Sequence, residues 1–181
     1  MAGSVALADL DDLFRLIAAP NVFYEPQIDR LAGELREYFL ESNPPDPYGL
    51  GPYEMVLGLG YAVKRSRCGV WLDHTEGPLL QEECAAVIER RVGRPDEFWQ
   101  DPDSYTDFVW SGSDVGEGLA AFDSWLADDP IASDPVFSPK RLVSVDTRSD
   151  FYVAIVCREE AAEELVGVLA GFGVSAELLN T

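Results

Sequence analysis

Residues 151–157, FYVAIVC, constrain the fold most, because apolar side chains occupy nearly every position. A strand with one face in water alternates apolar and polar residues, whereas a continuous apolar run is typical of a central strand covered on both faces. Residues 141–146, RLVSVD, precede this run across the turn residues 147–150, TRSD. We therefore predict two neighbouring strands joined by a hairpin, in a sheet that needs cover on both sides.

Amphipathic stretches elsewhere in the chain can supply this cover. Apolar residues at helical spacing predict helices over residues 10–17, 28–39, 80–92, 114–127 and 158–170, with a short helical piece at 54–59. Alternating apolar residues in 61–74 predict two short strands around a turn near 66–69, and residues 174–179 predict a closing strand. The spacing of Asp114 and Glu117 fits a capping box at a helix start.

This order of elements predicts an α+β fold, with a mainly antiparallel sheet of four to five strands covered by amphipathic helices. A chain of 181 residues, 47% of them apolar, is long enough for one well-packed core. We expect a single domain, residues 1–181. Its parts are a helical N-terminal part (1–60), a strand pair, helices and an acidic segment (61–139), and a ββαβ part (140–181).

Charge is the abnormal quantity of the composition. The chain has 13 basic and 33 acidic residues, a net charge of −20. Such a surface repels nucleic-acid phosphates and anionic membranes and attracts cationic proteins, so we expect no direct nucleic-acid partner and no membrane partner. A second interpretation stays open: Lys64 and Lys140 are the only lysines, and a high-GC coding bias can acidify a surface without any partner.

The acidic segment, residues 96–129, concentrates this charge. Residues 95–139 contain no lysine or arginine, while acids alternate with aromatic residues. Acids steer a cationic protein and aromatic side chains hold it, so this composition favours a partner-binding surface. The residues that we expect to contact a basic protein are Asp101, Asp103, Tyr105, Asp107, Trp110, Asp114, Glu117, Asp128 and Asp129. The alternative is a solvated surface over core aromatic residues, with Phe122 and Trp125 on the apolar stripe of a helix.

Motifs for catalysis and cofactors are weak. His74 is the only histidine, which argues against zinc sites and, without a GxSxG motif, against a Ser–His–Asp hydrolase. The glycine-rich stretches lack the Lys-Ser/Thr of a phosphate loop, and residues 101–112 lack the glycine and glutamate of a calcium loop. We predict no catalytic residue, no metal and no cofactor. An alternative pocket would use Asp73, His74, Asp146 and Asp150.

Three cysteines, at positions 68, 84 and 157, form no CxxC pair. Reduced thiols in a cytoplasmic protein are the plain interpretation, with Cys68 the one expected to be exposed, in a turn. The N-terminus has no basic region before an apolar run, and no apolar stretch is long enough to span a membrane. We therefore expect neither a signal peptide nor a membrane helix.

The C-terminal third resembles a family of small uncharacterised bacterial α+β proteins. The resemblance rests on LVSVDTRSDFYVAIV and EEAAEELVGVLAGFGVSAEL, whose hairpin carries Asp146, Ser149, Asp150 and Tyr152, and on residues 69–77, GVWLDHTEG. In size and acidity the chain is also similar to immunity proteins of polymorphic toxin systems, which bind and block a toxin domain. The resemblance implies no catalytic residue.

The sequence thus favours a cytoplasmic, non-enzymatic protein-binding domain, an immunity protein or inhibitor of a cationic toxin such as a nuclease. The alternative is a small-molecule-binding protein or a hydrolytic enzyme built on the His74 pocket. A structural module without a discrete site is a third interpretation. Composition leaves the oligomeric state open.

Overall fold

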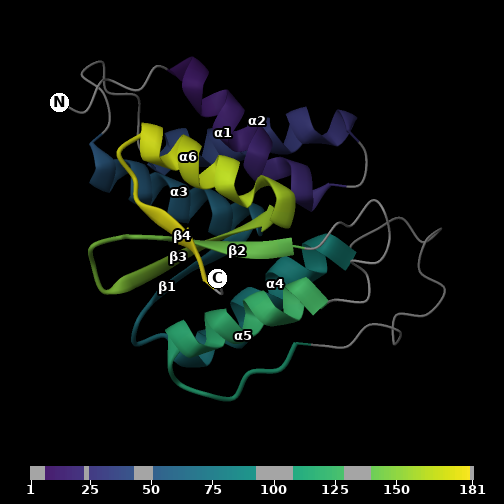
Figure 1. The fold of residues 1–181 in the computed structure, drawn as a ribbon, viewed down its shortest axis with the longest axis vertical. Coiled ribbons are helices and arrows are strands. Elements are labelled where there is room, and N and C mark those ends of the chain that lie inside the picture. Colours follow the sequence, from purple (N-terminus) through teal and green to yellow (C-terminus); the bar gives the residue numbers. More distant parts are fainter. Residues whose placement is uncertain (1–6, 23–24, 43–50, 93–107, 129–139, 180–181) are drawn as a thin grey trace.

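The computed structural model describes residues 7–22, 25–42, 51–92, 108–128 and 140–179 (Figure 1). These residues form six α-helices and four β-strands. In chain order they are α1 (Leu7–Ala18), α2 (Pro26–Ser42), α3 (Pro52–Ser66), β1 (Gly69–Asp73), α4 (Leu80–Val92), α5 (Val115–Asp128), β2 (Lys140–Val145), β3 (Phe151–Arg158), α6 (Ala162–Gly171) and β4 (Ala176–Leu178). None of these helices combines the length and the apolar character needed to cross a membrane.

The four strands form one antiparallel sheet in the order β1-β3-β2-β4. Strand β3 lies in the interior of the sheet, and residues 153–157 are buried. The prediction of an α+β fold with an antiparallel sheet covered by helices is confirmed, as is the central, doubly covered place of the apolar run.

Helices cover both faces of the sheet (Figure 1). Helices α1, α2, α3 and α6 lie on one face, and α4 and α5 lie on the other. Successive side chains of a strand point to opposite faces, so Val153, Ile155 and Cys157 pack against the four-helix layer. Ala154 and Val156 pack against the α4/α5 layer. Two separate apolar cores result, one on each side of the sheet.

Helix α3 corrects one prediction, because residues 61–66 continue a helix instead of forming the first strand of a pair. Tyr61 and Val63 alternate like strand residues, but Leu59, Ala62 and Val63 also share one helical face and are buried. Packing of that face against the other helices of its layer and against the sheet decides in favour of the helix. The expected turn is present: Arg67 adopts a left-handed φ of 60°, and its N–H donates to the carbonyl oxygen of Lys64, 3.2 Å away.

Helix α5 begins as the capping spacing predicts. The Oδ1 atom of Asp114 accepts a hydrogen bond from the backbone N–H of Glu117 at 2.8 Å. The helix ends at Asp128, one residue beyond its predicted end.

Candidate functional site

A cavity of about 810 Å³ lies at the turn between β2 and β3. We call it the hairpin pocket; residues 144–152, residues 175–177 and His74 line it. Its titratable side chains are His74, Asp146, Arg148, Asp150, Tyr152 and Glu177. The pocket therefore collects residues from the ends of all four strands of the sheet.

Pairing of β1 with β3 brings His74 to this place. Asp73 and Phe151 are partners in the ladder, so the residues beyond them, His74 and Asp150, meet at the end of the two strands. The backbone N–H of His74 donates to the carbonyl oxygen of Asp150 at 2.8 Å, and ring atom Nδ1 lies 3.0 Å from the same oxygen. A carbonyl oxygen only accepts, so Nδ1 carries the proton and Nε2 is the ring atom left to meet a ligand.

Asp73 has a structural task beside the pocket. Its carboxylate accepts hydrogen bonds from the backbone N–H and the hydroxyl of Thr75, at 2.9 and 2.8 Å. These bonds lower the pKa of Asp73, and the neighbouring His74 adds a smaller effect in the same direction. Of the four residues expected to form an alternative pocket, His74, Asp146 and Asp150 line it, and Asp73 fixes the turn next to it.

The hairpin turn is held by its own hydrogen bonds. Asp146 Oδ1 accepts the backbone N–H of Arg148 at 3.0 Å, and the hydroxyl of Thr147 donates to the carbonyl oxygen of Phe151 at 2.7 Å. The backbone N–H of Asp146 donates to Ser175 at 2.8 Å, which ties the turn to the segment before β4. The pocket wall is therefore preformed.

The electrostatic balance of the hairpin pocket is negative. Asp146, Asp150 and Glu177 face one guanidinium, that of Arg148, whose side chain is 84% exposed and lies 4.0 Å from Asp146. Asp150 and Glu177 make no ion pair with any side chain in the described part of the chain. Screening by water weakens the exposed Asp146–Arg148 contact. The pocket therefore favours cationic groups over anions.

Helix α5 begins next to this pocket. A Cβ placed on Gly116 would lie 3.5 Å from the hydroxyl of Tyr152 and 3.3 Å from Oδ1 of Asp114. Tyr152 thus connects the pocket to the acidic start of α5, where Asp114 and Glu117 are exposed.

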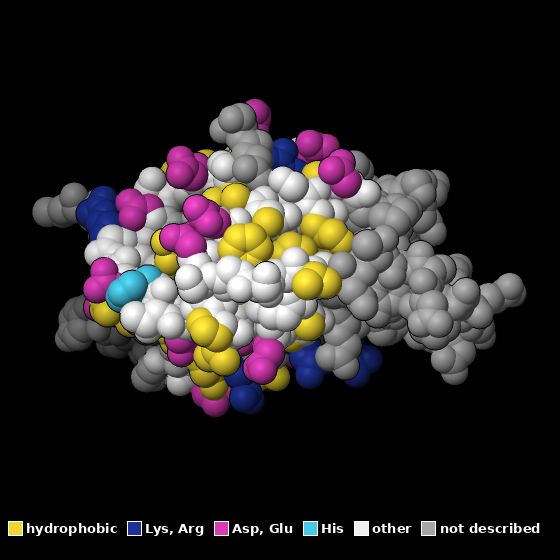
Figure 2. Space-filling model, turned by 90° about the horizontal axis from the view of Figure 1, so that it is seen from below, with side chains coloured by type: hydrophobic (Ala, Val, Ile, Leu, Met, Phe, Trp, Pro, Cys, Tyr) yellow, Lys and Arg dark blue, Asp and Glu magenta, His cyan; other side chains and the backbone are white. Residues whose placement is uncertain are grey.

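A second surface lies over α4 and α5. Figure 2 shows this side of the molecule, with hydrophobic side chains gathered near its middle, acidic side chains around them and basic ones toward the margin. Two large apolar side chains are exposed on the segments that precede these helices in the chain. Leu79, before α4, is 42% exposed, and Val109, before α5, is 77% exposed. We call the exposed residues Leu79, Val109, Asp114, Glu117 and Asp128 the α5 face.

Gln81 fixes the backbone of the α5 face. Its Oε1 accepts the backbone N–H of Trp110 at 2.6 Å, and its Nε2 donates to the carbonyl oxygen of Phe108 at 2.7 Å. One side-chain amide therefore binds the chain on both sides of Val109. The exposed valine is presented by an ordered backbone.

The aromatic residues described in the acidic segment face inward. Phe108 and Phe122 are buried with ring centroids 4.9 Å apart, and Trp125 stacks on Phe122 at 5.9 Å. Trp110, expected to be exposed, is half-buried against Gly118. Of the expected partner-binding residues, Asp114, Glu117 and Asp128 are exposed. Asp101, Asp103, Tyr105, Asp107 and Asp129 lie outside the described residues.

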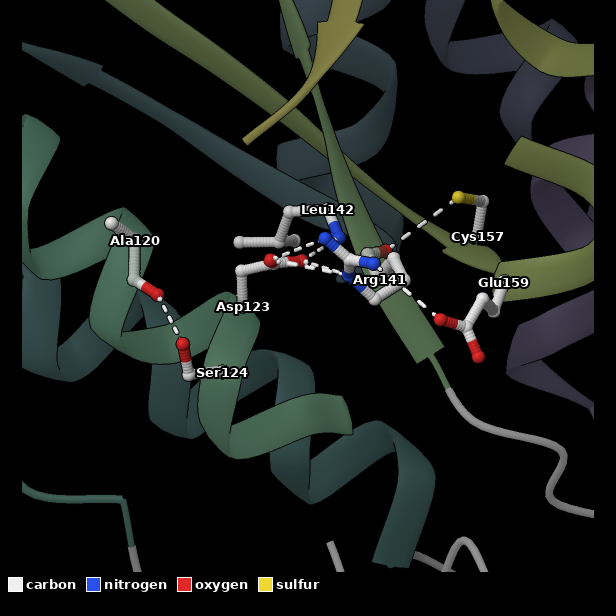
Figure 3. Close-up of polar contacts among 7 residues, drawn as sticks. All are labelled: Ala120, Asp123, Ser124, Arg141, Leu142, Cys157 and Glu159. Carbon is white, nitrogen blue, oxygen red and sulfur yellow. Dashed lines mark hydrogen bonds and ion pairs between the residues drawn. The ribbon is translucent and has the colours of Figure 1, made fainter. Parts of the chain in front are cut away.

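Although residues 95–139 contain no lysine or arginine, Asp123 of this segment has a cationic partner elsewhere in the chain. It is buried on α5 and binds Arg141, the second residue of β2 (Figure 3). The Arg141 Nε atom lies 3.2 Å from both carboxylate oxygens, and the backbone N–H of Leu142 donates to Oδ1 at 2.6 Å. The hydrogen bond to Asp123 raises the pKa of Arg141. The sequence signal that could have predicted this pair is the position of Asp123, directly after Phe122 of the apolar stripe of α5.

The cysteines offer no accessible nucleophile. Cys68, expected to be exposed, is buried together with Cys84 and Cys157, because it lies where α3 turns directly into β1. Burial raises the pKa of Cys84 and raises the pKa of Cys157 to about 12.

No group of three or more potential ligands in the described residues is arranged to hold a metal ion. Comparison of the chain with protein-family models, curated proteins and solved structures finds no match. The function is therefore inferred from the chemistry of the hairpin pocket and of the α5 face.

Proposed function

We propose that the protein is a non-enzymatic binding domain that engages a cationic protein through the α5 face. The observation that carries this proposal is Val109, which is 77% exposed although Gln81 holds the backbone on both sides of it. Exposing a large apolar side chain on an ordered backbone has a cost in water that contact with a partner would remove.

Charge indicates the class of partner. Asp114, Glu117 and Asp128 are exposed on the α5 face, and residues 95–139 contain no lysine or arginine. Such a field accelerates association with a basic protein by about 10- to 10³-fold and weakens with salt. An immunity protein or inhibitor that occupies the basic groove of a toxin nuclease fits this chemistry.

The contacts of His74 favour binding over hydrolysis. Among the described residues the ring of His74 pairs with the carboxylate of Asp73 and the backbone oxygen of Asp150, and no hydroxyl or thiol is paired with it. Nucleophilic catalysis needs such a group within hydrogen-bonding reach of its base.

The test begins with capture of partners from the native host, followed by association kinetics of the purified complex at several salt concentrations. The double variant Asp114→Asn/Glu117→Gln should slow association, and Val109→Ser should speed dissociation. The matched control is Glu163→Gln/Glu164→Gln, which removes two exposed acids from α6 on the opposite layer. Equal effects of the two double variants, with no effect of Val109→Ser, would rule out the α5 face.

A further inference from the structure

We propose that the hairpin pocket is a binding site for an organic cation that carries an ammonium or guanidinium group. No lining residue of the pocket belongs to the α5 face, so the site does not depend on a protein partner there, although Tyr152 of the pocket lies next to the start of α5. Its volume of about 810 Å³ lies within the range of about 300–1,000 Å³ that is usual for small-molecule sites.

Backbone hydrogen bonds tie the walls of the pocket to one another. Strands β2, β3 and β4, together with the turn between β2 and β3, supply most of the lining. The hydrogen bond from His74 to Asp150 and that from Asp146 to Ser175 fasten both ends of the hairpin turn to neighbouring segments. A ligand would therefore find its polar contacts in place, which lowers the entropic cost of binding.

The polar atoms favour a ligand that donates several hydrogen bonds. The carboxylates of Asp146, Asp150 and Glu177 accept only, and the hydroxyls of the lining can accept as well. His74 uses its Nδ1 proton on the carbonyl oxygen of Asp150, so a neutral His74 offers an acceptor at Nε2. Tyr152, which packs on the α4/α5 side of the sheet, adds an aromatic side chain, and aromatic rings attract cations.

The spacing of these acceptors distinguishes an organic cation from a metal ion. The acidic and histidine side chains of the pocket are not grouped closely enough to share one ion, since no three such residues in the described part of the chain form a metal-binding group. An ammonium or guanidinium carries three or more N–H donors on a larger framework and can reach separated carboxylates.

Arg148 makes it possible to test whether the ligand of the pocket is positively charged. Its guanidinium is the one permanently positive side chain in the lining, and it is 84% exposed at the rim. It repels a cation and attracts an anion. Removing it should therefore strengthen the binding of a cation, whereas removal of an ordinary ligand contact would weaken it.

The experiment is a titration followed by amide chemical shifts of the labelled full chain. Nα-acetyl-argininamide and Nα-acetyl-citrullinamide form the central comparison, since they have almost the same shape and differ by one charge. The arginine compound should shift amides of residue 74 and of segments 144–152 and 175–177 in a saturable manner. The citrulline compound should bind at least about tenfold more weakly, as expected for the loss of charge-assisted hydrogen bonds.

Variants locate the binding. Asp150→Asn and Glu177→Gln should each weaken the arginine compound by about tenfold. Arg148→Asn should strengthen it about two- to threefold, as expected for an exposed charge. Asn also tolerates the left-handed φ of 50° at this position. The matched control Glu163→Gln, an exposed acid on α6, should leave the affinity unchanged.

Agmatine and a short arginine-containing peptide separate the two sources of such a cation. Tighter binding of agmatine identifies a free small molecule, and tighter binding of the peptide identifies a basic side chain of a polypeptide; either result supports the site. Equal binding of the arginine and citrulline compounds, the absence of saturable shifts, or an equal effect of Asp150→Asn and Glu163→Gln would overturn it. Val109→Ser should not alter this titration. Failure of the hairpin-pocket proposal can therefore be distinguished from failure of the proposed role of the α5 face.

Discussion

The carboxylate of Asp123 and the guanidinium of Arg141 form a buried ion pair between α5 and β2, with Nη2 3.1 Å from Oδ2. The side chain of Asp123 is 1% exposed and that of Arg141 is 13% exposed. The same carboxylate accepts the backbone N–H of Leu142, so one residue binds both the side chain and the backbone of the strand. This pair is a principal polar link between the α4/α5 layer and the sheet.

Replacing Asp123 by Ala should therefore lower the free energy of unfolding by about 3–5 kcal/mol, because the Arg141 guanidinium loses its buried partner. Urea denaturation measures this change. Asp128→Ala, an exposed acid at the end of the same helix, should change stability by no more than about 0.5 kcal/mol. In a double-mutant cycle, Asp123→Ala and Arg141→Met should cost clearly less together than the sum of the single changes. Additive costs would mean that the pair is not coupled.

Gly118 should not tolerate a side chain, although alanine is the better helix former. A Cβ at this position would meet the side chain of Leu80 and lie 2.9 Å from Nε1 of Trp110. Overpacking should make Gly118→Ala destabilising by about 1–3 kcal/mol. Gly167→Ala on α6 is the control, because nothing lies within 4 Å of its added Cβ. It should stabilise the protein by about 0.5–1 kcal/mol, and thermal unfolding of both variants tests the contrast.

Gln81 should control the order of the segment that carries Val109. Its replacement by Ala removes two hydrogen bonds to the backbone of Phe108 and Trp110, at a cost of about 1–2 kcal/mol. Hydrogen exchange of the Trp110 amide should become faster. Gln81→Glu keeps the acceptor for Trp110 but loses the donor to Phe108, so the Trp110 amide should stay protected. Unchanged exchange in Gln81→Ala would show that other contacts hold this backbone.

The three thiols should be unreactive in the native protein. All are buried, and the raised pKa values of Cys84 and Cys157 keep these two protonated at neutral pH. Ellman's reagent should release almost no chromophore from the folded chain and three equivalents after unfolding in guanidinium chloride. A rapid reaction of one thiol in the native state would point to local opening around that residue.

The sequence predicts best those elements whose pattern has one interpretation. The continuous apolar run of β3, rich in β-branched and aromatic residues, is typical of a doubly covered strand, so its central position could be predicted. Tyr61 and Val63 fit both periods, and contacts outside this segment decide between strand and helix, such as those of Tyr61 with Tyr38 and Glu41 of α2. Local pattern contains no information about those contacts.

The candidate site likewise contains residues that the sequence could predict and one that it could not. His74, Asp146 and Asp150 flank predicted strands, so their meeting could be suggested as an alternative. Glu177 was missed because it reaches the hairpin pocket through the pairing of β4 with β2, where it lies opposite Ser144. Pairing between strands so distant in the chain is not encoded in either strand alone.

The sheet separates two apolar cores that share no buried side chain. Substitutions in the α4/α5 layer should therefore combine additively with those in the four-helix layer, since no side chain contributes to both cores. A library randomised at exposed positions of α5 and of residues 109–114 could thus be screened for new recognition properties without repacking α1, α2, α3 or α6. The protein could therefore serve as a scaffold in which the α4/α5 layer is varied while the four-helix layer is kept constant.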